Sequence, residues 1–255
     1  MFHGGIIACR RAGHPLGSNA GHLRVGPWGS FLRCGTATWQ RPKSVSMDDA
    51  DVDLWSEVRR LRCDVADRVA ALEPRSWDSA SWCEGWRVRD VLGHLVHLAE
   101  ANRRTMTLDL IRNGIVPDRA TSRVARTLGD EPVPELADRL RAAAGGRYHL
   151  LGSPSKVVLG EVLVHGSDAL RPLGLTTAAT PQDAGLVLDY YRRVAGLAFN
   201  ASPLRGVRLV ATDLDWQRGE GAEVTGTSMD LLLLIANRWA VLPFLRGPGI
   251  ARLAA

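Results

Sequence analysis

Residues 160–174 read GEVLVHGSDALRPLG, and this stretch decides the fold that we expect. Glu161 and His165 are four residues apart, so on a helix both side chains would lie on one face. Small and apolar residues flank Glu161, which indicates that its carboxylate points into the interior. An unpaired carboxylate is costly there unless a cation or a hydrogen-bond donor meets it. The pattern therefore predicts a buried helix over residues 157–170 with an inward-facing polar pair.

Three stretches before this helix also have helical periodicity. Apolar residues recur at spacings of three and four at Leu54, Val58, Leu61, Val65, Val69 and Leu72, and again at Val88, Val91, Leu92, Leu95, Leu98 and Ala99. A third helix is expected over residues 133–151. The polar residues 112–131, which include glycine and proline, are expected to connect elements over the surface. Four amphipathic helices predict a helical bundle over residues 47–175.

The C-terminal third has a different pattern. We expect a long helix at 181–199, a strand at 206–216, a hairpin at 219–224, and a helix at 228–239 that begins at a serine cap. Strands mixed with helices after an all-helical half are typical of a separate α+β domain. The expected fold is therefore α+β and mostly helical, with the four-helix bundle followed by a smaller α+β domain over residues 176–255.

The excess of basic charge comes from one end of the chain. Residues 1–46 hold six of the 32 basic side chains and no acidic one, so 26 basic and all 27 acidic residues follow from Met47 onward. A balanced body without a basic stripe argues against nucleic-acid binding, which depends on phosphate neutralisation. We interpret residues 1–46 as a disordered extension, with Met47 as the natural start of the protein.

The four cysteines and the apolar runs indicate a cellular compartment. Cys9, Cys34, Cys63 and Cys83 form no CxxC pair and no disulfide framework, which fits a reducing environment. No apolar run approaches the roughly 18 to 20 residues that span a bilayer. The N-terminus lacks the hydrophobic region of a secretory signal. We therefore expect a cytoplasmic protein without a membrane partner, present as a monomer or a small homo-oligomer.

Glu161 and His165 can converge on one ion if a neighbouring helix supplies a third ligand. The helix that begins after Trp86 offers two candidates, His94 and His97. Two histidines and one carboxylate form a common zinc set that leaves a coordination position open. Packed, hydrogen-bonded histidines are the competing interpretation, because ExxxH pairs also arise by chance in helices.

Asp168, three residues beyond His165, lies on nearly the same helix face. It is either an acceptor for the second nitrogen of a ligand histidine or a plain charge on the helix surface. The spacing does not decide between these roles.

Two segments resemble the mycothiol-dependent maleylpyruvate isomerase family, within the DinB-like four-helix superfamily. Trp77 is followed by SWCEGWRVRDVLGHLVHLAE at residues 81–100, and GEVLVHGSDALRPLG comes later in the chain. Residues 206–240, GVRLVATDLDWQRGEGAEVTGTSMDLLLLIANRWA, are similar to that family's second domain. The resemblance covers roughly residues 50–252 and implies a metal-binding bundle with a smaller second domain.

The resemblance also implies which side chains act. The family's metal is held by the histidine of its CxGWxVRDVxxHL segment and by the glutamate and histidine of its ExxxHxxD segment. On this sequence these are His94, Glu161 and His165, so the resemblance favours His94 over His97. The family's arginine near the C-terminus matches Arg238, where this chain has Asn-Arg instead of Gly-Arg. That arginine is expected to bind an anionic substrate or the thiol cofactor, with an exposed helix arginine as the alternative.

The implied activity is a metal- and thiol-dependent isomerisation or S-transfer. A divalent ion, zinc by preference, would stabilise the thiolate of mycothiol or a similar small thiol, which attacks a small anionic electrophile. Arg238 and Asp168 are the expected catalytic residues. Two alternatives remain open: metal-assisted hydrolysis, and a metal- and ligand-binding protein without catalysis.

The remaining notable side chains are interpreted as structure. Trp77, Trp82 and Trp86 are expected to cap the mouth of the bundle, and one of them could line a pocket. Cys83 is expected to be a packed thiol.

Overall fold

The computed structural model describes residues 47–112, 117–149, 154–198 and 204–254. The helices are α1 (Met47–Ala70), α2 (Pro74–Trp77), α3 (Val88–Glu100), α4 (Arg103–Arg112), α5 (Pro117–Gly129), α6 (Val133–Ala142), α7 (Lys156–Leu170), α8 (Pro181–Ala198), α9 (Ser228–Ile235) and α10 (Ile250–Ala254), with 3-10 helices η1 (Arg171–Leu173) and η3 (Trp239–Phe244). The strands are β1 (Val207–Ala211), β2 (Gln217–Arg218) and β3 (Ala222–Gly226). The expected N-terminal extension, residues 1–46, lies outside the described residues.

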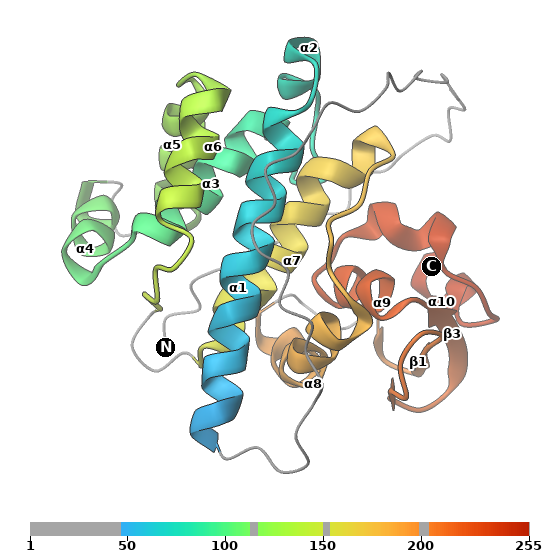
Figure 1. The fold of residues 1–255 in the computed structure, drawn as a ribbon. Coiled ribbons are helices and arrows are strands. Elements are labelled where there is room, and N and C mark those ends of the chain that lie inside the picture. Colours follow the sequence, from blue (N-terminus) through green and yellow to red (C-terminus); the bar gives the residue numbers. More distant parts are fainter. Residues whose placement is uncertain (1–46, 113–116, 150–153, 199–203, 255) are drawn as a thin grey trace.

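Four helices, α1, α3, α6 and α7, pack around a shared apolar core (Figure 1). They correspond to the four helices expected from periodicity, so the predicted bundle is confirmed. Helix α3 begins where the Asp90 carboxylate accepts the Arg87 backbone N–H at 2.8 Å. Helix α6 ends at Ala142, short of the expected residue 151, because Gly145 and Gly146 follow. The bundle brings the inner faces of α3 and α7 together.

The prediction that residues 112–131 connect elements over the surface is wrong for most of its length. Helix α5 occupies Pro117–Gly129 and packs along α3. Ala120 and Ala125 are buried on its inner face and Leu128 packs against the core, so the helix does have an apolar stripe, which the glycine and proline residues around it obscure in the sequence. Proline at the first position and glycine at the last are normal helix boundaries. In the sequence alone, the same two residue types favour a loop.

The C-terminal part contains a three-stranded sheet in the order β2-β1-β3. Strand β1 pairs antiparallel with β2 and parallel with β3, so the hairpin expected at residues 219–224 is wrong. Instead, the chain crosses the start of β1 there. Gly221 adopts a φ of 113° next to the Gly206 carbonyl oxygen, which a Cβ at residue 221 would overlap. The mixture of helices with this small sheet confirms the α+β fold class. The domain boundary at residue 176 stays a prediction, since α8 packs directly on α7.

The residue that caps the start of helix α9 lies one position earlier than expected. Thr227, rather than Ser228, is the cap: its hydroxyl accepts the Asp230 N–H at 3.1 Å, and Asp230 accepts back from Thr227. Ser228 is the first helical residue, and its N–H and hydroxyl donate to Asp213. None of the described helices is long and apolar enough to span a bilayer.

Gly160 sets how closely α8 approaches α7. A Cβ at this position would overlap the phenol ring of Tyr191, which is 1% exposed. Glycine inside a helix costs about 1 kcal/mol relative to alanine. The close approach of the Tyr191 ring explains why glycine is present here.

We expect Gly160→Ala to lower the free energy of unfolding by about 2 kcal/mol, because the overlap with Tyr191 outweighs the better helix propensity. Urea unfolding followed by circular dichroism measures the change. Gly145→Ala is the matched control, since a Cβ there would meet nothing within 4 Å. Equal stability of the two variants would contradict this account of the α7–α8 contact.

Candidate metal centre

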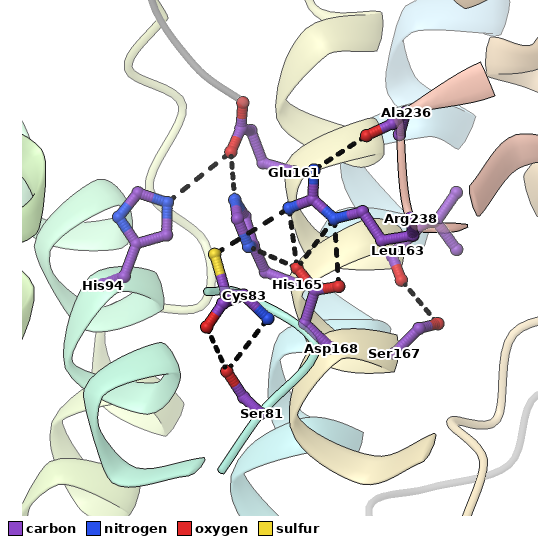
Figure 2. Close-up of polar contacts among 10 residues, drawn as sticks. All are labelled: Ser81, Cys83, His94, Glu161, Leu163, His165, Ser167, Asp168, Ala236 and Arg238. Carbon is purple, nitrogen blue, oxygen red and sulfur yellow. Dashed lines mark hydrogen bonds and ion pairs between the residues drawn. The ribbon is translucent and has the colours of Figure 1, made fainter. Parts of the chain in front are cut away.

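Three buried side chains from α3 and α7 converge on one point (Figure 2). His94 comes from α3, while Glu161 and His165 come from consecutive turns of α7; their exposed fractions are 1%, 3% and 0%. Glu161 Oε2 lies 3.2 Å from His165 Nε2 and 3.6 Å from His94 Nε2. One nitrogen or oxygen from each side chain lies within 4.8 Å of the others. The helical i,i+4 spacing thus brings the pair on α7 to the histidine on α3.

These polar atoms lack hydrogen bonds among the described residues. Both ring nitrogens of His94, both carboxylate oxygens of Glu161 and Nε2 of His165 are buried without a partner of proper hydrogen-bond geometry. The 3.2 Å and 3.6 Å approaches are therefore close contacts in which no N–H is aligned with an acceptor. Ligand atoms bound to a tetrahedral zinc lie roughly 3.3 Å apart, so the spacing of these atoms fits a common cation.

Asp168 fixes the orientation of His165. Its Oδ2 lies 3.0 Å from His165 Nδ1, and both side chains are fully buried. A carboxylate at this position accepts the Nδ1 proton, so Nε2 is the ring nitrogen that faces Glu161 and His94. The alternative of Asp168 as a charge on the helix surface is therefore wrong. Whether Asp168 also acts in catalysis stays a prediction.

Arg238 binds Asp168 from the opposite side. Its Nε lies 3.0 Å from Oδ1 and its Nη2 lies 2.7 Å from Oδ2, and none of the arginine side chain is exposed. The alternative of an exposed helix arginine is wrong, because Arg238 follows the end of α9 and points into the interior. Although burial raises the pKa of Asp168, the Arg238 charge and the hydrogen bond from His165 outweigh it and lower that pKa to about 2. Asp168 is therefore an anion held between two donors.

The backbone before Arg238 turns sharply to aim this side chain. Asn237 has a φ of 64°, and its N–H donates to the Leu234 carbonyl while the Arg238 N–H donates to the Leu233 carbonyl. These two bonds define the Schellman motif, whose left-handed position favours glycine and accepts asparagine. The Asn-Arg pair therefore keeps the backbone geometry that a Gly-Arg pair would give.

We expect Asn237→Val to destabilise the protein by about 1–2 kcal/mol, since a β-branched residue tolerates left-handed backbone poorly. Asn237→Gly should leave stability within a few tenths of a kcal/mol. Thermal unfolding of the two variants, side by side, measures the difference. If valine is tolerated as well as glycine, the left-handed turn does not hold Arg238 in place.

Charge and burial act differently on the two histidines. Burial lowers the pKa of His94 to about 4, and the neighbouring His165 adds to the effect, so His94 is neutral at pH 7. Burial also lowers the pKa of His165, but Asp168 and Glu161 outweigh it and raise that pKa overall. For Glu161, burial raises the pKa while the two imidazoles lower it, and the lowering is larger. Glu161 is therefore ionised, and neutral His94 offers one nitrogen lone pair to a cation.

Cys83 belongs to a second group of potential ligand atoms, together with His165 and Asp168. The Arg238 guanidinium already lies in this group, with Nη2 at 4.0 Å from Cys83 Sγ and hydrogen-bonded to Asp168 (Figure 2). A cation thus already compensates the negative charge there. Cys83 is fully buried, as expected of a packed thiol.

The structure separates His97 from the cluster. His97 Nε2 lies 3.5 Å from Asp109 of α4, with 14% of its side chain exposed.

Trp86 contacts both cluster histidines: its ring is edge-on to His94 at 5.2 Å and stacked on His165 at 6.2 Å between centroids. Trp86 was expected only as one of three tryptophans at the mouth, because sequence spacing cannot tell which aromatic residue packs on the ligands. In the structure Trp86 directly follows Gly85, which has a φ of 72°.

Residues 58–151 match the family model of the mycothiol maleylpyruvate isomerase N-terminal domain. This segment is therefore similar to that domain family. The matched segment contains His94 but ends before Glu161 and His165, so the family match does not itself cover the α7 pair. No curated protein matches the sequence.

The fold is also similar to solved structures of the mycothiol-dependent maleylpyruvate isomerase. The crystal structure of that isomerase has a TM-score of 0.50 and 15% sequence identity, covering 77% of this chain and 92% of that chain. The crystal structure of a mutant of it has a TM-score of 0.49 and 13% identity over the same shares. At these identities the likeness to the isomerase concerns the fold.

Proposed function

We propose that the protein is a metal-dependent enzyme that uses a small thiol of the mycothiol type to isomerise, or to transfer sulfur to, a small electrophile. The observation that carries the proposal is the buried cluster of His94, Glu161 and His165, in which every polar side-chain atom except His165 Nδ1 lacks a hydrogen-bond partner among the described residues. The name of the matched domain family supplies the thiol and the reaction type. Zinc is the ion that this donor set fits best.

The chain's own residues prepare this site for a cation. Glu161 supplies a negative charge, His94 is neutral, and His165 Nε2 faces both of them because Asp168 accepts from Nδ1. A metal bound by these three atoms would lower the pKa of a thiol and so favour the reactive thiolate. The Trp86 ring packs against both imidazoles, which are buried from solvent.

Two expected features receive different support. The donor set supports the formation of a thiolate. The expectation of an anionic substrate, in contrast, depends on Arg238. Because Arg238 is fully buried and bound to Asp168, it offers no argument for an anion in the substrate.

Hydrolysis is the less favoured alternative. It needs a general base, and the two candidate carboxylates, Glu100 and Asp168, are engaged elsewhere. Glu100 pairs with Arg139 on the surface at 2.8 Å, and Asp168 is held by Arg238 and His165. A metal-binding protein without catalysis shares the same ligands, so only turnover distinguishes it from an enzyme.

The decisive experiment incubates zinc-loaded protein with maleylpyruvate in the presence and absence of mycothiol, and identifies products by mass spectrometry and NMR. The proposal expects an isomer or a thioether that forms only when both zinc and the thiol are present. A hydrolysis product formed without thiol would support the hydrolase alternative. Zinc binding with no product from maleylpyruvate or from a panel of simple Michael acceptors would favour the binding protein.

A further inference from the structure

We infer that Arg238 is a positioning residue of the metal site: it holds Asp168, Asp168 holds His165, and the C-terminal part of the chain thereby completes a site otherwise built by the bundle. The inference rests on the proposed function only in that the site binds a metal. It assigns Arg238 a different role from the expected contact with substrate or thiol.

The Arg238 guanidinium donates hydrogen bonds to Asp168 from two of its nitrogens. Nε lies 3.0 Å from Oδ1 and 3.2 Å from Oδ2, and Nη2 lies 2.7 Å from Oδ2. The third nitrogen, Nη1, donates to the Ala236 carbonyl at 2.8 Å, which fixes the plane of the fork. Such a two-pronged pair restricts rotation of the carboxylate, which a single point charge does not do.

The same carboxylate oxygen links Arg238 to the ligand histidine. Oδ2 of Asp168 takes the Nη2 bond from Arg238 and the 3.0 Å contact with His165 Nδ1 (Figure 2). A rotation of Asp168 would therefore also release the imidazole, whose Nε2 must face Glu161. Groups that orient a metal ligand in this way typically change metal affinity by 10–100-fold when removed.

Arg238 reaches the site from a different part of the fold than the ligands. It follows α9, which packs on α8 and the sheet, and the left-handed turn at Asn237 directs it inward. The side chain is 0% exposed, so contact with a soluble anion would require it to leave Asp168. Burial and bonding together point to a structural support for His165 rather than to a substrate contact.

The test measures the zinc affinity of purified apo-protein by competition with a chromogenic chelator, for wild type, Arg238→Met, Asp168→Asn and the double variant. We expect each single variant to bind zinc at least about tenfold more weakly. If Arg238 acts through Asp168, the double variant should be no weaker than the weaker single variant. The double variant removes both buried charges, so it remains informative if Arg238→Met alone folds poorly.

Arg171→Met is the matched control. Arg171 pairs with Asp230 at 2.8 Å and so also joins the end of α7 to α9, but the pair does not contact the ligands. Its zinc affinity should stay within about twofold of wild type. Nitrogen-15 NMR of the apo-protein gives an independent reading, because loss of Arg238 should change the His165 side-chain signals and loss of Arg171 should not.

Unchanged zinc affinity in folded Arg238→Met would overturn the inference, as would losses that simply multiply in the double variant. Failure of the wild type to bind zinc would instead remove the proposed function.

Discussion

His94→Ala is expected to abolish thiol-dependent turnover and to weaken zinc binding by more than about 100-fold, while the protein stays folded. His94 is the single ligand candidate from α3, and the pair on α7 cannot complete a three-ligand site without it. Removing a ligand should exceed the 10–100-fold effect of removing a group that only orients a ligand. Zinc affinity, circular dichroism and product formation with mycothiol measure the three parts of the prediction.

His97→Ala is the matched control for this experiment. His97 lies on the same helix, three residues further on, and contacts Asp109 rather than the cluster. It should keep wild-type zinc affinity and turnover. If both alanine variants lose activity equally, or if His94→Ala retains zinc, the assignment of His94 is wrong.

The metal-free protein is expected to lose about 3 kcal/mol of stability as the pH falls from 6.5 to 4. The folded-state pKa of His94 is lowered to about 4 from an ordinary value of 6.5, by burial and by His165. Between pH 6.5 and 4, His94 binds a proton in the unfolded chain but stays neutral in the folded chain, so acid favours unfolding. The stability is fully present above pH 6.5 and is lost progressively below it.

The other groups of the site act in different windows. The raised pKa of His165 contributes stability that is lost only as the pH rises above 6.5, and the lowered pKa values of Glu161 and Asp168 act below their ordinary values of 4.5 and 3.8. Among the groups of the site, only the histidines with lowered pKa values, chiefly His94, act between pH 6.5 and 4.5. Outside the site, burial raises the pKa of Glu57 and gives a contribution of opposite sign near the lower end of this interval, which a comparison with a His94 variant cancels.

Urea unfolding in the presence of a chelator, repeated along this pH series, measures the loss. His94→Gln should show a much flatter profile between pH 6.5 and 4.5, and His97→Gln should keep most of the slope. Identical slopes for wild type and His94→Gln would show that His94 is not held neutral by burial.

Periodicity was sufficient to predict the helices of the bundle, because their apolar stripes are made of Leu and Val at regular spacing. It failed for α5, because the helix boundaries Pro117 and Gly129 are residues that are also typical of loops. It also failed for β3, since parallel pairing with β1 depends on a chain crossing at Gly221 that no local pattern reveals. Proline and glycine at helix ends and non-local strand pairing are the features that misled the prediction from this single sequence.

The candidate site was predictable to a similar extent. The i,i+4 pair Glu161 and His165 followed from helical geometry, but the choice of His94 over His97 required the family resemblance. The contact between Arg238 and Asp168 joins residues 70 positions apart, and no spacing rule predicts it. Sequence reasoning therefore found the metal-site candidates and offered Asp168 as an acceptor for a ligand histidine, but it missed the contact between Arg238 and Asp168.

X-ray absorption spectroscopy of the zinc-loaded protein, prepared without added thiol, tests the central claim most directly. The account predicts one zinc per chain, with two imidazole nitrogens and carboxylate or water oxygen at about 2.0–2.1 Å and no sulfur. A sulfur neighbour at about 2.3 Å would place the ion at Cys83 instead. That result, or a protein that retains no zinc, would contradict a site built from His94, Glu161 and His165.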